Sequence, residues 1–213
     1  MAAESEPRTG TGYPAERTKA FVDAVVAIAL TLLILPLMES VSGAAAAGDG
    51  ALGWLAEHGG PLLNFGLSFV LIAMFWMIHH RLFAGVARVT PILMWLLVAW
   101  MLTIVWLPVA TAIAGRMNDD DAVAKTLYIG SLALTALMSL VVRVYLRAHP
   151  ALHTVSRREL LTGVAVDVSL VLLFGVALAA ALLIPGIGYY ALFVMALSGV
   201  VQKALGKMLR ADP

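Results

Sequence analysis

The chain has 213 residues, of which 62% are hydrophobic and 13% are charged, and its formal net charge at pH 7 is +1. Soluble globular domains are typically about 45–50% apolar and about 25% charged, so this composition excludes an ordinary soluble protein and indicates an integral membrane protein. The chain has no cysteine, which excludes disulfides, thiol catalysis and cysteine metal sites.

Six apolar segments are each about long enough to cross a hydrocarbon core of about 30 Å as a helix. Each segment is continuously apolar, whereas the strands of a membrane barrel alternate in hydrophobicity over about ten residues. We therefore predict an all-α membrane protein with six transmembrane helices. In chain order these are Ala20–Met38, Pro61–Ile78, Pro91–Ala114, Val123–Leu146, Leu160–Ile184 and Gly188–Leu205.

The segments divide the chain into three parts. A cytoplasmic polar arm is expected over residues 1–19, a single six-helix transmembrane domain over 20–206 and a short cytoplasmic tail over 207–213. The first apolar run is longer than the apolar region of a signal peptide and contains an aspartate, which favours a retained helix. The acidic loop 118–121 and the Pro-Gly turn 185–188 separate helices three and four, and helices five and six.

The basic residues predict the orientation, because cytoplasmic loops carry an excess of Lys and Arg. One set of alternate connections contains 12 of the 14 basic residues. The other set contains Arg116 and Lys125. Six helices with both termini cytoplasmic account for this asymmetry. The first set consists of Arg8, Arg17, Lys19, Arg81, Arg88, Arg143, Arg147, Arg157, Arg158, Lys203, Lys207 and Arg210.

Two acidic residues, Asp23 and Asp167, lie inside predicted membrane helices. A charge there costs about 2.5–3.5 kcal/mol on insertion scales, so each acid is a candidate functional group. Both lie near the amino-terminal end of their helix, where the macrodipole and unpaired backbone N–H groups favour a carboxylate. We therefore favour a structural role, the orientation of neighbouring helices, over direct contact with an ion.

A histidine pair, His79 and His80, ends the second predicted helix. Adjacent helical residues point about 100° apart, so the pair does not face a common metal ion. We expect one histidine at the aqueous interface and the other turned inward to bond a carboxylate or a carbonyl. No nucleophile and base grouping, phosphate loop or close carboxylate pair is recognisable, so the sequence predicts no enzyme.

An aliphatic stripe follows the first predicted helix. At 100° per residue its members fall on one face, Thr31 lies beside them, and Asp23 lies about 140° from the stripe. On its own such a stripe indicates a surface that faces lipid or packs against another helix. Its members are Phe21, Val25, Ile28, Leu32 and Leu35.

The same helix carries a motif that resembles the first-helix signature of the transmembrane protein 175 family, potassium channels of endolysosomes and prokaryotes. Residues 75–83, Phe-Trp-Met-Ile-His-His-Arg-Leu-Phe, resemble the end of that family's second helix. The family motif has a serine where this chain has Val22, which removes one hydroxyl from the polar cluster. The first-helix motif consists of Arg17, Phe21 and Asp23, followed by Ile28, Leu32, Leu35 and Pro36.

The resemblance implies a pore lined by the first helix of several subunits and constricted by aliphatic side chains in place of a carbonyl filter. Thr31 would lie near the constriction and bear on selectivity. A cytoplasmic polar network would position the helix. The implied constriction consists of Ile28, Leu32 and Leu35. The implied network consists of Arg17, Phe21, Asp23 and His80.

The expected function is therefore a potassium-selective channel, a homotetramer because family members with one six-helix unit resemble tetramers. The resemblance implies a multi-pass protein of a prokaryotic plasma membrane, with potassium as the permeant ion, lipid as its surroundings, no cofactor and no nucleic-acid partner. Residues 20–206 would form the channel domain. Two alternatives stay open, an ion- or proton-coupled secondary transporter that uses Asp23 and Asp167, and a non-conducting membrane scaffold.

Overall fold

The computed structural model describes residues 12–47, 50–118, 121–184, 186, 188–197, 201 and 202. Predictions for residues 1–11, for the tail 207–213 and for the basic residues Lys203, Lys207 and Arg210 lie outside these ranges. The described elements are helical apart from two short strands. In order they are β1 Tyr13–Pro14, α1 Glu16–Leu32, α2 Leu35–Ala47, α3 Ala51–Glu57, α4 Gly59–Ala84, β2 Arg88–Val89, α5 Pro91–Arg116, α6 Ala122–Ala148, η1 Pro150–Leu152, α7 Arg157–Leu183 and η2 Gly188–Leu197.

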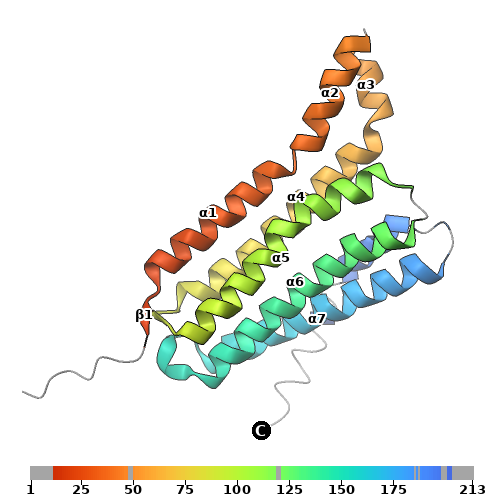
Figure 1. Cartoon of the computed structure of the whole chain (residues 1–213). Helices are drawn as coiled ribbons and strands as arrows, with labels where there is room; N and C mark the ends of the chain where they lie inside the picture. The colour runs from red at the N-terminus through yellow and green to blue at the C-terminus, as the bar shows by residue number, and fades with distance from the viewer. Residues whose placement is uncertain are drawn as a thin grey trace, which may run out of the picture.

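Five long helices form a bundle, and the short pair α2 and α3 projects beyond it at one end (Figure 1). α6 packs against α5 and α7, while α1 packs against α5 and α4. Five segments are long and apolar enough to cross a membrane, which confirms an all-α membrane protein. These segments are Glu16–Ser42, Gly59–Ala84, Pro91–Arg116, Ala122–Ala148 and Arg157–Leu183.

The sixth predicted span begins as a 3-10 helix, η2 Gly188–Leu197. Residues 198–200 and 203–205, which complete the predicted span, lie outside the described ranges. The preceding turn is present, since Gly186 and Gly188 have φ angles of 77° and 45°, which favour glycine. Six spans therefore stay a prediction, with five supported by the described residues.

The first predicted helix corresponds to one candidate span, Glu16–Ser42, but it contains a break, not predicted, that separates α1 from α2. The break lies at Leu33 and Ile34. Pro36 has no N–H to donate to the carbonyl of Leu32, and its ring crowds that carbonyl. The Ile34 amide instead bonds the Thr31 carbonyl at 3.3 Å in a tighter turn. The outer half of the segment consequently leaves the axis of α1 (Figure 1).

The helix starts have clear local causes. Thr90 accepts a hydrogen bond from the Leu93 amide and is followed by Pro91, which suits the first turn of α5. Asp121 accepts from the Val123 and Ala124 amides at the start of α6. Ser156 and Glu159 form a reciprocal capping box at the start of α7.

One end of the bundle carries most of the described basic residues, and we call it the basic end: Arg17, Lys19, Arg81, Arg88, Arg147, Arg157 and Arg158. Here β1 pairs antiparallel with β2. The Ala15 amide bonds the Ala87 carbonyl at 3.1 Å, and the Ala87 amide bonds the Leu152 carbonyl at 2.9 Å. These bonds join the start of α1 to the loops that connect α4 with α5 and α6 with α7.

The core lies between α1, α4, α5, α6 and α7, and is rich in aromatic side chains. Its largest fully buried members are Trp100, Tyr128, Phe75 and Phe174. Large apolar side chains on the outward faces of α5, α6 and α7 are exposed, including Leu102, Leu134 and Leu172. An apolar outer surface is what a bilayer requires of a spanning bundle.

Candidate ion path and its supporting contacts

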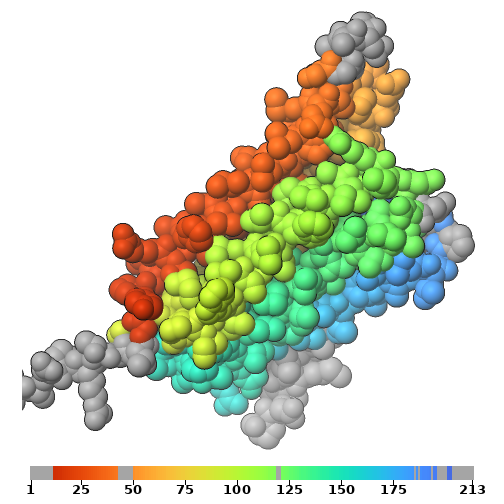
Figure 2. All heavy atoms as spheres, in the orientation of Figure 1, coloured from red at the N-terminus to blue at the C-terminus, as the bar shows by residue number. Residues whose placement is uncertain are grey.

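The α1 helix has two different faces. Val22, Val26 and Ala29 are buried against the bundle, together with Leu33 just beyond the helix. The opposite face is open and includes the three residues that the resemblance places at a constriction. α1 and α2 accordingly form a ridge along one edge of the molecule (Figure 2). The exposed members of this face are Phe21 at 60%, Ile28 at 58%, Leu32 at 38% and Leu35 at 51%.

The open face combines aliphatic side chains with one hydroxyl. Thr31 is exposed, and its hydroxyl donates to the Ile28 carbonyl at 2.8 Å. Leu35 follows the break and belongs to α2, so it does not lie on the same straight helix as Ile28 and Leu32. Val25, the remaining stripe residue, is half-buried. Below, "the open face" denotes Phe21, Ile28, Thr31, Leu32 and Leu35.

Asp23 lies off the open face and is held by α4. The Trp76 Nε1 donates to Asp23 Oδ1 at 2.8 Å, and His80 Nδ1 lies 3.9 Å from the same oxygen. α1 begins seven residues earlier at Glu16, so the helix amino terminus does not stabilise this carboxylate, contrary to our expectation. Arg17 is exposed and takes part in no hydrogen bond or ion pair among the described residues.

The histidine pair divides between the surface and the core as predicted, but the inward histidine does not have the predicted polar partner among the described residues. His80 is exposed and is the one that faces a carboxylate. His79 is buried and stacks on Phe83 and Trp100, each with a ring-centroid distance of 4.3 Å. Its Nε2 has no hydrogen-bond partner within the described chain. The inward histidine is thus held by aromatic contacts, not by a carboxylate or carbonyl.

Asp167 forms a buried ion pair with Arg143. The Arg143 Nε lies 2.5 Å from Asp167 Oδ2, and both side chains are almost completely buried between α6 and α7. A side chain at Gly163 would collide with the guanidinium, because an added Cβ would lie 2.1 Å from Arg143 Nη1. The pair fits the predicted structural role of Asp167. It also corrects the assignment of Arg143 to a solvent-facing basic loop.

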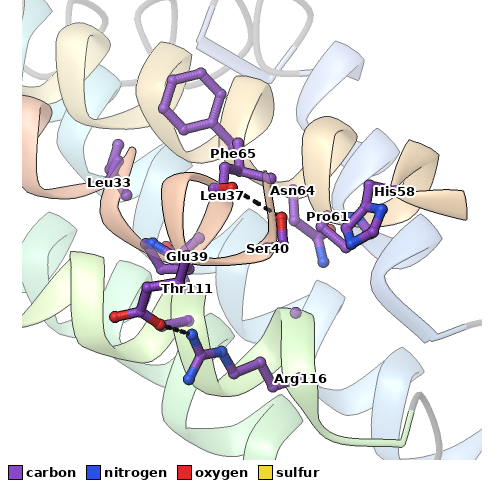
Figure 3. A pocket seen from close by; sticks show the side chains of 13 residues that line it. Leu33, Leu37, Glu39, Ser40, His58, Pro61, Asn64, Phe65, Thr111 and Arg116 are labelled. Atoms are coloured by element: carbon purple, nitrogen blue, oxygen red, sulfur yellow. Dashed lines mark hydrogen bonds and ion pairs between the residues drawn. The ribbon is translucent and has the colours of Figure 1, made fainter. Parts of the chain in front are cut away.

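A cavity of about 410 Å³ lies behind the break between α1 and α2. Side chains of α2, α4 and α5 surround it, and an ion pair between Glu39 and Arg116 lies on its wall (Figure 3). Ser40 and Thr111 contribute hydroxyls, while Leu37 and Phe65 contribute apolar surface. The segment that leaves the α1 axis therefore has free space on its bundle side.

Comparison with known proteins finds sequence similarity over the region that contains α1, α4 and part of α5. Residues 17–108 match the family model described as endosomal/lysosomal potassium channel TMEM175. A potassium channel of Streptomyces collinus is 34% identical over 124 residues, which are 57% of this chain and 58% of that protein. Part of the chain is thus similar to the TMEM175 family. An endosomal/lysosomal proton channel TMEM175 of Gallus gallus is 33% identical over 111 residues, 50% of this chain and 22% of that protein.

The matched family model and the Streptomyces relative are both named as potassium channels, and neither name is that of an enzyme. The matched region runs from the arginine of the first-helix motif through α4 and into α5. This chain matches 58% of the length of the Streptomyces relative and 16% of the Danio rerio proton channel TMEM175, to which it is 37% identical over 83 residues. The ion that this chain conducts and the number of copies that assemble are therefore proposals.

Two contacts of this chain were missed by sequence reasoning. Trp76 was not singled out from the sequence, and it donates the hydrogen bond that holds Asp23. Arg143 was expected in a basic loop, and it instead pairs with Asp167. Both partners are far apart in the chain, by 53 and 24 residues. The signal available was the presence of an acid in an apolar helix, which requires a donor on a neighbouring helix.

Proposed function

We propose that this chain is one subunit of a potassium-selective channel, and that the α1–α2 segments of four copies surround the pore. The observation that carries the proposal is the open face. One side of α1 is buried against α4 and α5, while the side with Ile28 and Leu32 has no cover within the described chain. Four copies around an axis would place these side chains in a ring.

In the proposed pore, rings of branched aliphatic side chains control whether water enters the narrow part of the path. A narrow apolar ring excludes water and closes by dewetting, and a small widening admits water and a partly hydrated ion. Thr31 is the hydroxyl of this face, and its oxygen keeps a lone pair after donating to the Ile28 carbonyl. That lone pair is positioned to meet a permeating cation. The polar network of Asp23, Trp76 and His80 holds the helix from the other side.

The gating element in this proposal is the break at Leu33 and Ile34. Leu35 follows the break, and the cavity of about 410 Å³ lies on the bundle side of α2. Movement of α2 into this cavity would draw Leu35 away from the axis. The Glu39–Arg116 ion pair lies on the wall of the same cavity, so it would change the free energy of that movement.

The basic end would face the cytoplasm of a prokaryotic cell, because positive residues are retained on that side. The described basic end carries Arg17, Lys19, Arg81, Arg88, Arg147, Arg157 and Arg158, whereas the opposite end carries Arg116 and Lys125. Both termini would then be cytoplasmic if the sixth predicted span crosses the membrane.

Flux measurements on purified protein in liposomes test the proposal. Ile28→Asn places an amide in the apolar ring, so water enters and potassium flux rises several-fold while selectivity over sodium falls. Leu35→Ala, which shortens a side chain on α2, should alter conductance as well. Val176→Asn is a matched control, because Val176 is 55% exposed on α7, outside the proposed path. Unchanged flux in both variants, with wild-type flux present, would exclude the open face as the pore.

Proton conduction is the second candidate, since the Gallus gallus and Danio rerio relatives are named as proton channels. A pH-sensitive dye inside the same liposomes separates the two ions under a fixed potential. Potassium flux with little acidification supports the first candidate, and acidification without potassium flux supports the second. A coupled transporter that uses Asp167 is disfavoured because Arg143 already pairs with that carboxylate.

A further inference from the structure

A second and larger cavity lies away from the open face, between α4, α6 and α7 at the basic end. Its volume is about 800 Å³. Three arginines contribute to its wall, Arg81 from α4, Arg143 from α6 and Arg158 from α7. The proposed ion path uses none of them.

The lining of this cavity changes from charged to apolar along two helices. On α4 it passes from Arg81 to Ile78 and Met74, and on α7 it passes from Arg158 to Thr162 and then to the apolar pair Val166 and Leu170. At 1.5 Å per residue these runs extend about 10 Å and about 18 Å into the bundle from the arginines. The two helices are antiparallel, since α4 ends and α7 begins at the basic end. Arg81 and Arg158 therefore both lie at the basic end of the cavity, and the apolar lining residues lie farther from that end.

The charged part of the cavity lining carries a net positive charge. Arg81 and Arg158 are exposed, and neither forms an ion pair with another part of the chain that the structure describes. Arg143 is fixed by Asp167, with its Nη1 beside Gly163. Glu159 also lines the cavity, but its carboxylate accepts the Ser156 amide and hydroxyl at 3.0 and 2.8 Å. Two guanidiniums that have no ion-pair partner among the described residues thus line the cavity.

We propose that this cavity binds an anionic phospholipid, with the phosphate between Arg81 and Arg158 and one acyl chain along Ile78, Met74, Val166 and Leu170. Guanidinium groups bind phosphate oxygens through paired, charge-assisted hydrogen bonds. Basic pockets between membrane helices are suited to lipid headgroups, and the apolar depth suits a chain and not a free anion. The proposal depends on insertion of the bundle in a bilayer and is independent of the ion that is conducted.

Native mass spectrometry of the full chain, released from micelles containing equal amounts of phosphatidylglycerol and phosphatidylcholine, tests the site. The wild type should retain phosphatidylglycerol in preference to phosphatidylcholine. The double variant Arg81→Gln/Arg158→Gln should lose that preference by about tenfold or more, since each basic group near an anionic surface contributes a factor of about five. Arg147→Gln/Arg157→Gln removes the same charge from exposed positions of the basic end outside the cavity lining, and it should retain the preference.

Competition distinguishes the lipid from its headgroup. Inorganic phosphate and a dihexanoyl phosphatidylglycerol, at the concentration of the long-chain lipid, should displace little of it. Displacement by inorganic phosphate would overturn the lipid in favour of a free anion. Equal loss in the two double variants would reduce the effect to general surface charge and overturn the site. Failure of the wild type to retain phosphatidylglycerol would mean that another copy or another segment of the chain covers the cavity, and the proposal would be wrong. Potassium flux is a separate measurement and does not decide any of these outcomes.

Discussion

The segment Glu16–Ser42 and the helix α6 are both candidate membrane spans, but the protein buries them to different extents. The first has a mean hydropathy of 2.5 in its most apolar window and is 28% buried there, while α6 has a mean hydropathy of 1.8 and is 50% buried. The less apolar helix is therefore the better packed one. In a bilayer, polar groups must find partners inside the protein, so the helix with polar side chains takes the centre.

The buried face of α6 shows how this is achieved. The hydroxyl of Thr135 donates to the Ser131 carbonyl at 2.9 Å, and that of Ser139 donates to the Thr135 carbonyl at 3.0 Å. Trp100 on α5 donates in turn to Ser139 at 2.9 Å. Small hydroxyl residues allow close approach of neighbouring helices in membranes. The first segment has no comparable row on its open face, which leaves that face available for other copies.

The largest loss of stability is expected from disruption of the ion pair between α6 and α7. Asp167→Ala leaves Arg143 as an unpaired buried charge, and the loss of a partner from such a pair costs about 3–5 kcal/mol. Thermal unfolding in detergent should show a large fall in the midpoint. The double variant Arg143→Met/Asp167→Leu removes both charges and should recover most of the stability. Wild-type stability of Asp167→Ala would contradict the importance of the pair.

A smaller effect is expected where α1 is attached to α4. Trp76→Phe removes the donor to Asp23, a hydrogen bond to a charged group worth about 1.5–3 kcal/mol, with the lower end expected because Asp23 is partly exposed. Trp95→Phe is the matched control, since Trp95 is 73% exposed. Flux should change in the first variant because α1 loses its fixed rotation. Equal behaviour of the two variants in flux and unfolding would argue against the Asp23 contact.

The smallest stability effect is expected from filling the cavity behind α2. Ala112→Leu adds volume where the structure has space, so we expect a change of less than about 1 kcal/mol in unfolding free energy. Ala110→Leu on the same helix enters a fully buried position and should cost about 1–3 kcal/mol. If α2 moves into the cavity during gating, Ala112→Leu lowers the flux. Unchanged flux would remove this cavity from the gating proposal.

Much of the fold could be predicted because membrane helices are encoded by local composition. Five predicted segments correspond to candidate spans, and the turn at Gly186 and Gly188 is present where expected. The break at Leu33 was missed although Pro36 is visible in the sequence, because proline is tolerated within many membrane helices. α5 shows this, since it continues through Pro108. Proline alone therefore does not determine where a membrane helix divides.

The candidate site was predictable where it depends on one helix. The spacing of Phe21, Ile28 and Leu32 already placed them on one face and placed Asp23 on another. The partners of Asp23 and Asp167 depend on which helices become neighbours, and a single sequence does not specify that. The same limit explains why His79 was expected to meet a polar group and instead lies between two aromatic rings.

The sequence by itself determined that the chain is a helical membrane protein, and its motif with Arg17, Phe21 and Asp23 indicated the TMEM175 family. Hydropathy acts along the chain, so it reports which segments can span a bilayer. The tertiary structure decided which face of each helix is covered. It buried Val22 and Val26 while leaving Ile28 open, and it paired Asp167 with Arg143. These outcomes depend on contacts between helices, where the need to satisfy every buried polar group selects the neighbours.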